Sequence, residues 1–179
     1  ARMPLKTSPH IVHSNALTLD WEEVLPAQRC SYVLGNPPFL GKKEQSAAQK
    51  ADFECVMGHI KGFGVLDFVA AWYVKATRYM RQAQAGPHTV PAAPKSAQPA
   101  PATPLRVAFV STNSITQGEQ VGVLWGWMLA QGVHIHFAHR TFSWTNEAKG
   151  KAAVHCVIVG FGLQDVAEKT IFEYEDIKG

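Results

Sequence analysis

The chain has 179 residues, enough for one domain, and 46% of them are apolar, enough for a buried core. A formal net charge of +3 is only mildly basic, so charge alone neither establishes nor excludes nucleic acid as a partner. The sequence shows neither a long apolar span nor a secretory signal, and its three scattered cysteines are typical of reduced thiols, so we expect no membrane partner and a cytoplasmic protein.

The expected elements alternate between strands and helices. In chain order they are a short strand at 11–13, a helical turn at 21–25, a strand at 31–35, a loop and helix over 41–58, a helix over 66–83, a strand at 105–111, a helix over 117–131, strands at 133–138 and 152–161, and a short strand at 171–174. The helix over 66–83 has the clearest pattern, because apolar residues recur at helical spacing among good helix formers. This order predicts an α/β fold.

Residues 84–104 differ from the rest because alanine and proline dominate their composition. Such a segment buries too little apolar surface to offset the entropy lost on ordering it. We therefore expect a disordered insertion between a helix and a strand, with no role in chemistry.

The most informative motif is Asn36-Pro37-Pro38-Phe39, directly after the apolar run at 31–35. Two consecutive prolines prevent a helix from starting at Asn36, and Pro37 pushes that residue out of the helical region. The motif therefore predicts a rigid, extended turn at the carboxyl end of a strand, the edge at which open α/β sheets bind their ligands.

This turn offers two hydrogen-bond acceptors and an aromatic ring. The Asn36 side-chain oxygen and the Pro37 carbonyl can together accept both hydrogens of one NH2 group. The exocyclic amine of a nucleobase is a poor nucleophile because its lone pair is delocalised, and two such acceptors favour the tetrahedral nitrogen of the transition state. Phe39 can stack on the base. The alternative interpretation is a structural Asn-Pro turn.

The motif resembles the catalytic motif of amino-group methyltransferases that use S-adenosylmethionine, especially DNA adenine-N6 methyltransferases. The likeness is greatest to the methylase part of large single-chain type II restriction–modification enzymes. Three later stretches, 66–76, 107–113 and 142–161, resemble in this order the helix after the catalytic turn, the next strand, and the late loop and strand that close on the target base. The resemblance covers roughly residues 10–163.

The resemblance implies an α/β fold of the class I methyltransferase type, here a partial Rossmann-like fold with a mostly parallel sheet and an antiparallel terminal strand. The glycine-rich cofactor loop of the family has no counterpart in the 35 residues before Asn36. We therefore interpret residues 1–179 as the C-terminal portion of a methyltransferase catalytic domain, with an incomplete S-adenosylmethionine pocket and little activity alone. Missing strands would leave an open sheet edge, so we expect a homodimer through that edge.

The resemblance also implies roles for single residues. Asn36, Pro37, Pro38 and Phe39 form the catalytic turn. The implied cofactor contacts are Asn15, Asp20 and Trp72, and the implied stacking partners on the far face of the base are Phe142 and Trp144, in a polar loop over 141–151. The family usually has an acidic residue where Asn15 stands, a role that Asp20 could fill instead.

Each assignment outside the turn has a structural alternative. Asn15 and Asp20 are equally well explained as caps of turns, and Trp72 is at least as well explained as a core aromatic. We expect no metal site, because nothing in the spacing of His134, His136 and the later histidines fixes the convergence of ligands.

The expected function is methylation of the N6 amine of an adenine flipped out of double-stranded DNA. The same turn also serves enzymes that methylate guanine N2 in RNA or a glutamine side chain in proteins, so both stay open. A non-catalytic scaffold is the third interpretation.

Overall fold

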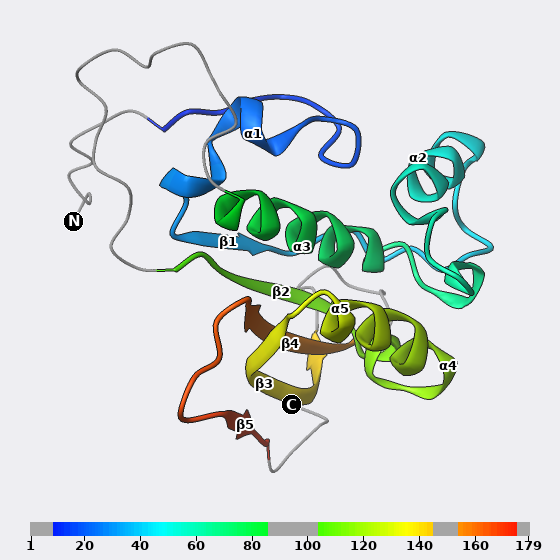
Figure 1. The fold of residues 1–179 in the computed structure, drawn as a ribbon. Coiled ribbons are helices and arrows are strands. Elements are labelled where there is room, and N and C mark those ends of the chain that lie inside the picture. The colour runs from blue at the N-terminus through cyan, green and yellow to red at the C-terminus, as the bar shows by residue number, and fades with distance from the viewer. Residues whose placement is uncertain (1–8, 86–103, 145–153, 175–179) are drawn as a thin grey trace, which may run out of the picture.

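The computed structural model describes residues 9–85, 104–144 and 154–174. Within these ranges the chain forms one sheet, and helices stand between its first three strands along the chain (Figure 1). The helices are α1 (Trp21–Val24), α2 (Ala47–Met57), α3 (Ala70–Gln84), α4 (Gly118–Gln120) and α5 (Gly126–Ala130), and the strands are β1 (Tyr32–Gly35), β2 (Arg106–Thr112), β3 (His134–Trp144), β4 (Val154–Gly162) and β5 (Thr170–Phe172).

The sheet has the order β1-β2-β4-β3-β5. β1 pairs in parallel with β2 and β3 in parallel with β5, whereas β4 runs antiparallel to both of its neighbours. Four strands therefore share one direction and one runs against them, which confirms the expected α/β fold with a mostly parallel sheet and an antiparallel strand late in the chain. That strand lies inside the sheet, and the short β5 follows it in the chain.

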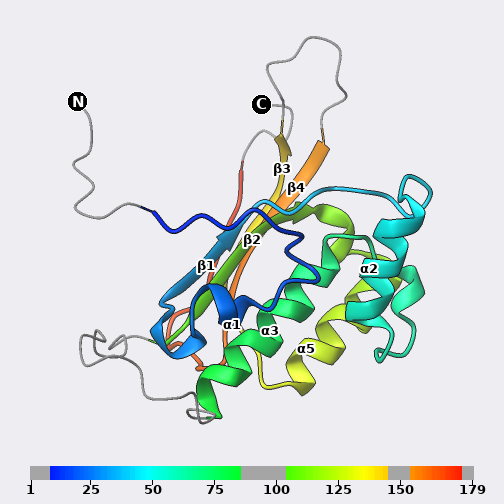
Figure 2. The same ribbon diagram turned by 90° about the horizontal axis from the view of Figure 1, so that it is seen from above.

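The helices α2, α3 and α5 lie on one face of the sheet (Figure 2). β2 shows why, because its residues alternate between partly exposed and fully buried, with Val107, Phe109 and Ser111 turned toward the helices. The opposite face carries exposed apolar side chains, including Leu34 at 73% exposure, and a hollow of about 910 Å³. The outer edge of β1 has no strand partner among the described residues, and the expected homodimer through such an edge stays a prediction.

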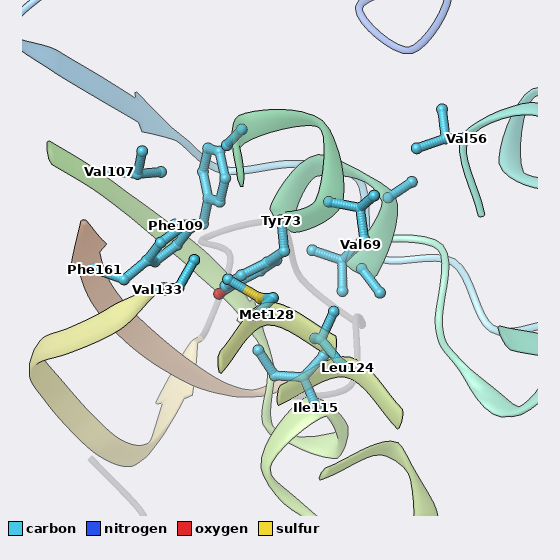
Figure 3. Close-up of a cluster of buried hydrophobic side chains, with 14 of the residues drawn as sticks. Val56, Val69, Tyr73, Val107, Phe109, Ile115, Leu124, Met128, Val133 and Phe161 are labelled. Carbon is cyan, nitrogen blue, oxygen red and sulfur yellow. The ribbon is translucent and has the colours of Figure 1, made fainter. Parts of the chain in front are cut away.

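Tyr73 is the centre of the core between α3 and the sheet (Figure 3). Its ring stacks on Phe161, with centroids 5.4 Å apart, and meets the rings of Phe109 and Trp125 edge-on. Its hydroxyl lies 2.8 Å from the Ser111 hydroxyl, and both residues are fully buried. Burial raises the pKa of Tyr73 far above its usual value, so the phenol stays neutral and either hydroxyl can donate in this bond.

Three details differ from the expected elements. Residues 11–13 form no strand, because Ile11 is 82% exposed and no described strand pairs with this segment. The helix over 117–131 is divided, because a π-helical stretch at Val121–Trp125 separates α4 from α5; glycine at 122 and 126 weakens regular helix there. β3 continues to Trp144 rather than ending at Ala138, because its antiparallel partner β4 extends equally far.

The structure describes the end of α5 but only the edges of the alanine- and proline-rich stretch. Gly132 follows α5 with a φ of 84°, the left-handed conformation of a helix end. The expected insertion at 84–104 lies almost wholly outside the described residues. No helix in the described part of the chain is both long and apolar enough to cross a membrane.

The Tyr73–Ser111 pair can be tested by a double-mutant cycle. Tyr73→Phe and Ser111→Ala each leave one buried hydroxyl without its partner, so each is expected to lower the free energy of unfolding by about 1–3 kcal/mol. The double variant removes both hydroxyls and is expected to lose less than the sum of the two single losses. Urea unfolding of the four proteins measures this, and strictly additive losses would contradict the pairing.

Gly160 on β4 is expected to tolerate no side chain. A Cβ built at this position would lie 2.1 Å from Cε1 of Phe137, whose ring covers the glycine from β3. Gly160→Ala should therefore lower the free energy of unfolding by about 1–3 kcal/mol. Gly122→Ala is the matched control, because nothing lies within 4 Å of that Cβ and alanine favours helix by about 0.5–1 kcal/mol. Equal effects of the two changes in urea unfolding would refute the steric explanation.

Candidate functional site

The Asn36–Phe39 turn leaves the sheet at the carboxyl end of β1, as the proline pair predicts. Gly35 allows this position because a Cβ there would lie 3.2 Å from the Phe109 ring, so the chain rests directly on the core. Pro37 is buried, whereas Asn36 is exposed and Phe39 is half-buried. The turn is thus anchored by one proline and presents its amide and its ring at the surface.

Both expected acceptors of this turn are available. Within the described ranges, neither the Asn36 side-chain amide nor the Pro37 carbonyl makes a hydrogen bond to another residue. The exposed Asn36 amide loses little while water solvates it, and both groups keep acceptor capacity for a ligand.

Phe39 forms one wall of a hollow of about 420 Å³. The floor comes from the last residue of β2, Thr112, and the two residues after it, together with Asp67, which precedes α3. Val154 and His155 at the start of β4 line the hollow as well. The hollow therefore lies where the carboxyl ends of β1 and β2 meet, the edge at which parallel sheets bind ligands, and its volume is that of a small-molecule site, roughly 300–1,000 Å³.

The charge of the hollow favours some ligands over others. Its described lining includes two carboxylates, Glu44 and Asp67, and neither lysine nor arginine. Such a lining repels a phosphate group and attracts cations or N–H donors. The hollow therefore suits a neutral ring with amine hydrogens better than the sugar-phosphate backbone of a nucleic acid.

Asn15 and Asp20 both cap local structure. The Asn15 amide nitrogen donates to Asp52 over 2.7 Å, and its oxygen accepts from the backbone N–H of Leu17 at 3.0 Å. Asp20 is the N-cap of α1 and accepts from the backbone N–H of Glu22 at 3.0 Å. Neither residue lines the 420 Å³ hollow, so the structural alternative describes the contacts they make, and their role toward a cofactor stays a prediction.

Trp72 lies on α3, half-buried against the core. Its ring meets Phe68 edge-on with centroids 5.3 Å apart, and it is not among the residues that line the hollow. The core interpretation accounts for these contacts, and the contact with a cofactor stays a prediction.

Phe142 and Trp144 lie on β3 rather than in the loop where the sequence placed them. They point to the same face, as alternate residues of a strand do, with ring centroids 6.2 Å apart. Trp144 pairs with Val154, which lines the hollow, whereas Phe142 pairs with Cys156 and contacts Tyr174. Trp144, 40% exposed, is therefore the better placed of the two for a ligand in the hollow.

The histidines of β3 each have a separate partner. His136 lies 2.8 Å from the carbonyl of Gln164, and His139 lies 2.6 Å from the Tyr174 hydroxyl. Across residues 9–85, 104–144 and 154–174, no group of three or more His, Cys, Asp or Glu side chains is close enough to hold a metal ion.

The sequence interpretation missed the floor of the hollow. Its two groups have no expected role in the site: Asp67 falls in the expected helix over 66–83, and of Thr112 to Ser114 the first two fall in the stretch that resembles the next strand and Ser114 falls in no expected element. One signal could have found the second group, because residues directly after a strand parallel to β1 must reach the same edge of the sheet. No comparable rule identifies Asp67, whose place depends on how α3 packs.

The chain matches proteins that are known. Residues 1–173 match the family model described as MmeI, DNA-methyltransferase domain. DNA methyltransferase A of Bacillus subtilis (strain 168) is 41% identical over 165 residues, which is 91% of this chain and 16% of that protein. A solved structure of the Type IIL restriction-modification enzyme MmeI in complex with DNA matches with a TM-score of 0.81 and 54% identity, covering 100% of this chain and 21% of that one.

The chain thus spans about a fifth or less of the length of these relatives. The family model, in contrast, covers all but the last six residues of the chain. The fold, the sequence identity and the family model agree, and the chain belongs to the MmeI DNA-methyltransferase domain family.

Proposed function

We propose that this chain carries the methyl-transfer site of a DNA methyltransferase in a restriction–modification enzyme, and that its substrate is the N6 amine of an adenine flipped out of double-stranded DNA. One observation carries the proposal: two acceptors that make no hydrogen bond within the described ranges, on Asn36 and Pro37, stand three and two positions before Phe39, whose ring lines a hollow at the carboxyl edge of the sheet. The MmeI–DNA complex, 54% identical, supports DNA as the partner.

The turn performs the chemistry by binding the amine in its reactive geometry. The adenine ring stacks on Phe39, and its two N6 hydrogens point at the Asn36 oxygen and the Pro37 carbonyl. These bonds strengthen as N6 becomes tetrahedral and positively charged, so they stabilise the transition state more than the bound base. N6 becomes acidic only as the new N–C bond forms, so its proton then passes to water and no residue has to remove it beforehand.

S-adenosylmethionine supplies the methyl group when it is bound. Two of the expected contact residues fit it. Asp20 uses one carboxylate oxygen as a helix cap, so the other would be available to a hydroxyl of the cofactor, and the half-buried Trp72 would offer a ring to pack on it. Asn15 already uses both ends of its amide and retains one N–H for a ligand.

The second stacking face is assigned to Trp144. Its strand partner Val154 lines the hollow, whereas Phe142 is engaged with Tyr174. An aromatic ring on each side of the base would offset part of the stacking energy that the base loses on leaving the duplex.

Replacement of Asn36 tests the proposed reaction directly. Asn36→Ala removes one of the two acceptors and is expected to lower kcat by at least about 100-fold, the loss typical for one transition-state hydrogen bond. The complete gene product containing this chain is expressed in a host without DNA methylation, and the host DNA is digested and analysed for N6-methyladenine.

The outcome is read against a fold control. Because Asn36 is exposed and makes no described contact, the circular dichroism spectrum and unfolding midpoint of the variant should match the wild type. A folded Asn36→Ala protein that methylates DNA at the wild-type rate would refute the assignment. Unmodified DNA from wild-type cells would redirect the proposal to RNA or protein amides.

Phe39 is expected to contribute through its ring alone. Phe39→Ala removes the stacking surface, worth about 1–3 kcal/mol per base, and should lower kcat/KM by roughly 5- to 150-fold. Phe39→Tyr keeps the ring and should retain most of the activity. Steady-state methylation of an oligonucleotide duplex measures both, and equal losses in the two variants would contradict a stacking role.

A further inference from the structure

Asp67 joins two chain segments that meet under the hollow. Its carboxylate accepts a hydrogen bond from the hydroxyl of Ser114, which lies 47 residues later in the chain, just after β2. Its backbone N–H donates to the side-chain oxygen of Gln120 at 3.1 Å. Asp67 is therefore held at both its side chain and its backbone by the segment that follows β2.

This carboxylate does not serve the helix that it precedes. An aspartate just before a helix usually accepts from the first free N–H groups of that helix. The N-cap of α3 is instead Val69, and no side chain caps it. The Asp67 carboxylate therefore accepts a long-range hydrogen bond from Ser114 instead of capping α3.

A second hydrogen bond connects Ser114 to the end of β2. The hydroxyls of Ser114 and Thr112 lie 2.9 Å apart. Ser114 has one hydroxyl hydrogen and donates it to the Asp67 carboxylate. In the bond between the two hydroxyls Ser114 is therefore the acceptor, and Thr112 is the donor. The resulting relay runs from Thr112 through Ser114 to Asp67, and all three residues line the hollow.

The residue after Asp67 contacts the chain just after the catalytic turn. The backbone N–H of Phe68 faces the carbonyl of Leu40 across a long contact of 3.5 Å. Leu40 directly follows Phe39, and both line the hollow. The peptide between Asp67 and Phe68 thus lies between the turn after β1 and the turn after β2.

We propose that Asp67 is a positioning residue of the methyl-transfer site: by holding the Thr112–Ser114 segment on one side and the Phe39–Leu40 segment on the other, it sets the distance between the stacking ring and the floor of the hollow. This inference rests on the proposed function. Asp67 acts through Ser114 and Phe39 and needs no contact with the base. Without the carboxylate, the distance between the two turns is no longer fixed by a shared contact. A displacement of about 1 Å at a reacting centre can lower the rate roughly 100-fold.

Three variants of the complete gene product test the inference. Asp67→Ala removes the acceptor and is expected to lower kcat by roughly 10- to 100-fold, with KM for a duplex oligonucleotide within about twofold of the wild type. Asp67→Asn keeps an oxygen that accepts from Ser114 and should recover most of the lost kcat. Asp67→Ala/Ser114→Ala should be no slower than Asp67→Ala, because both changes break the same tie.

The control is Glu119→Ala, which removes an exposed carboxylate next to Gln120 that does not line the hollow, and it should leave both constants unchanged. Unfolding midpoints are measured in parallel. An active wild type whose Asp67→Ala variant keeps its kcat, or loses it only in proportion to the unfolded fraction, would overturn the inference alone. An equal loss in Asp67→Asn would overturn it too. A wild type without any DNA methylation would refute the proposed function on which the inference rests.

Discussion

The hydrogen bond between Tyr73 and Ser111 fixes α3 against β2, and the site depends on that one contact. It lies in a core where aromatic rings surround the Tyr73 side chain, and the buried Thr77 hydroxyl nearby already donates to the Tyr73 carbonyl. If α3 shifted along β2, the Tyr73 and Ser111 hydroxyls would lose their hydrogen bond to each other. Thr112 follows Ser111 directly, so the same bond sets where the end of β2 lies relative to the start of α3.

The direction of the strands and the place of α3 between them determine where the site forms. β1 and β2 are parallel and neighbouring, so the turns after them open on the same side. α3 connects the two strands and begins at this edge, which brings Asp67 between the turns. The proline pair makes the first turn rigid, and the three-residue hydrogen-bonded relay holds the second. A hollow lined by several short segments thus keeps one shape.

The parts of this arrangement that the sequence predicts are those that depend on local rules. Proline stereochemistry places the Asn36–Phe39 turn, and the apolar periodicity of 66–83 predicts α3. What local rules miss depends on partners far away in the chain. β3 reaches Trp144 because β4 pairs with it, so two aromatics expected in a loop lie on a strand. Asn15 and Asp67 each accept or donate to residues about 40 to 50 positions away, which no local pattern reveals.

The two ends of the connection between α3 and β2 lie away from this chemistry. Gln28, before β1, donates to the carbonyl of Gln82 near the end of α3, and Gln84 and Pro104 line one hollow at the amino end of the strands. The methyl-transfer turns open at the opposite end of the same strands. Related proteins could therefore differ in the length and sequence of the stretch between α3 and β2, while selection acts on the turns alone. For the experimenter, the same stretch is a natural place for a reporter tag.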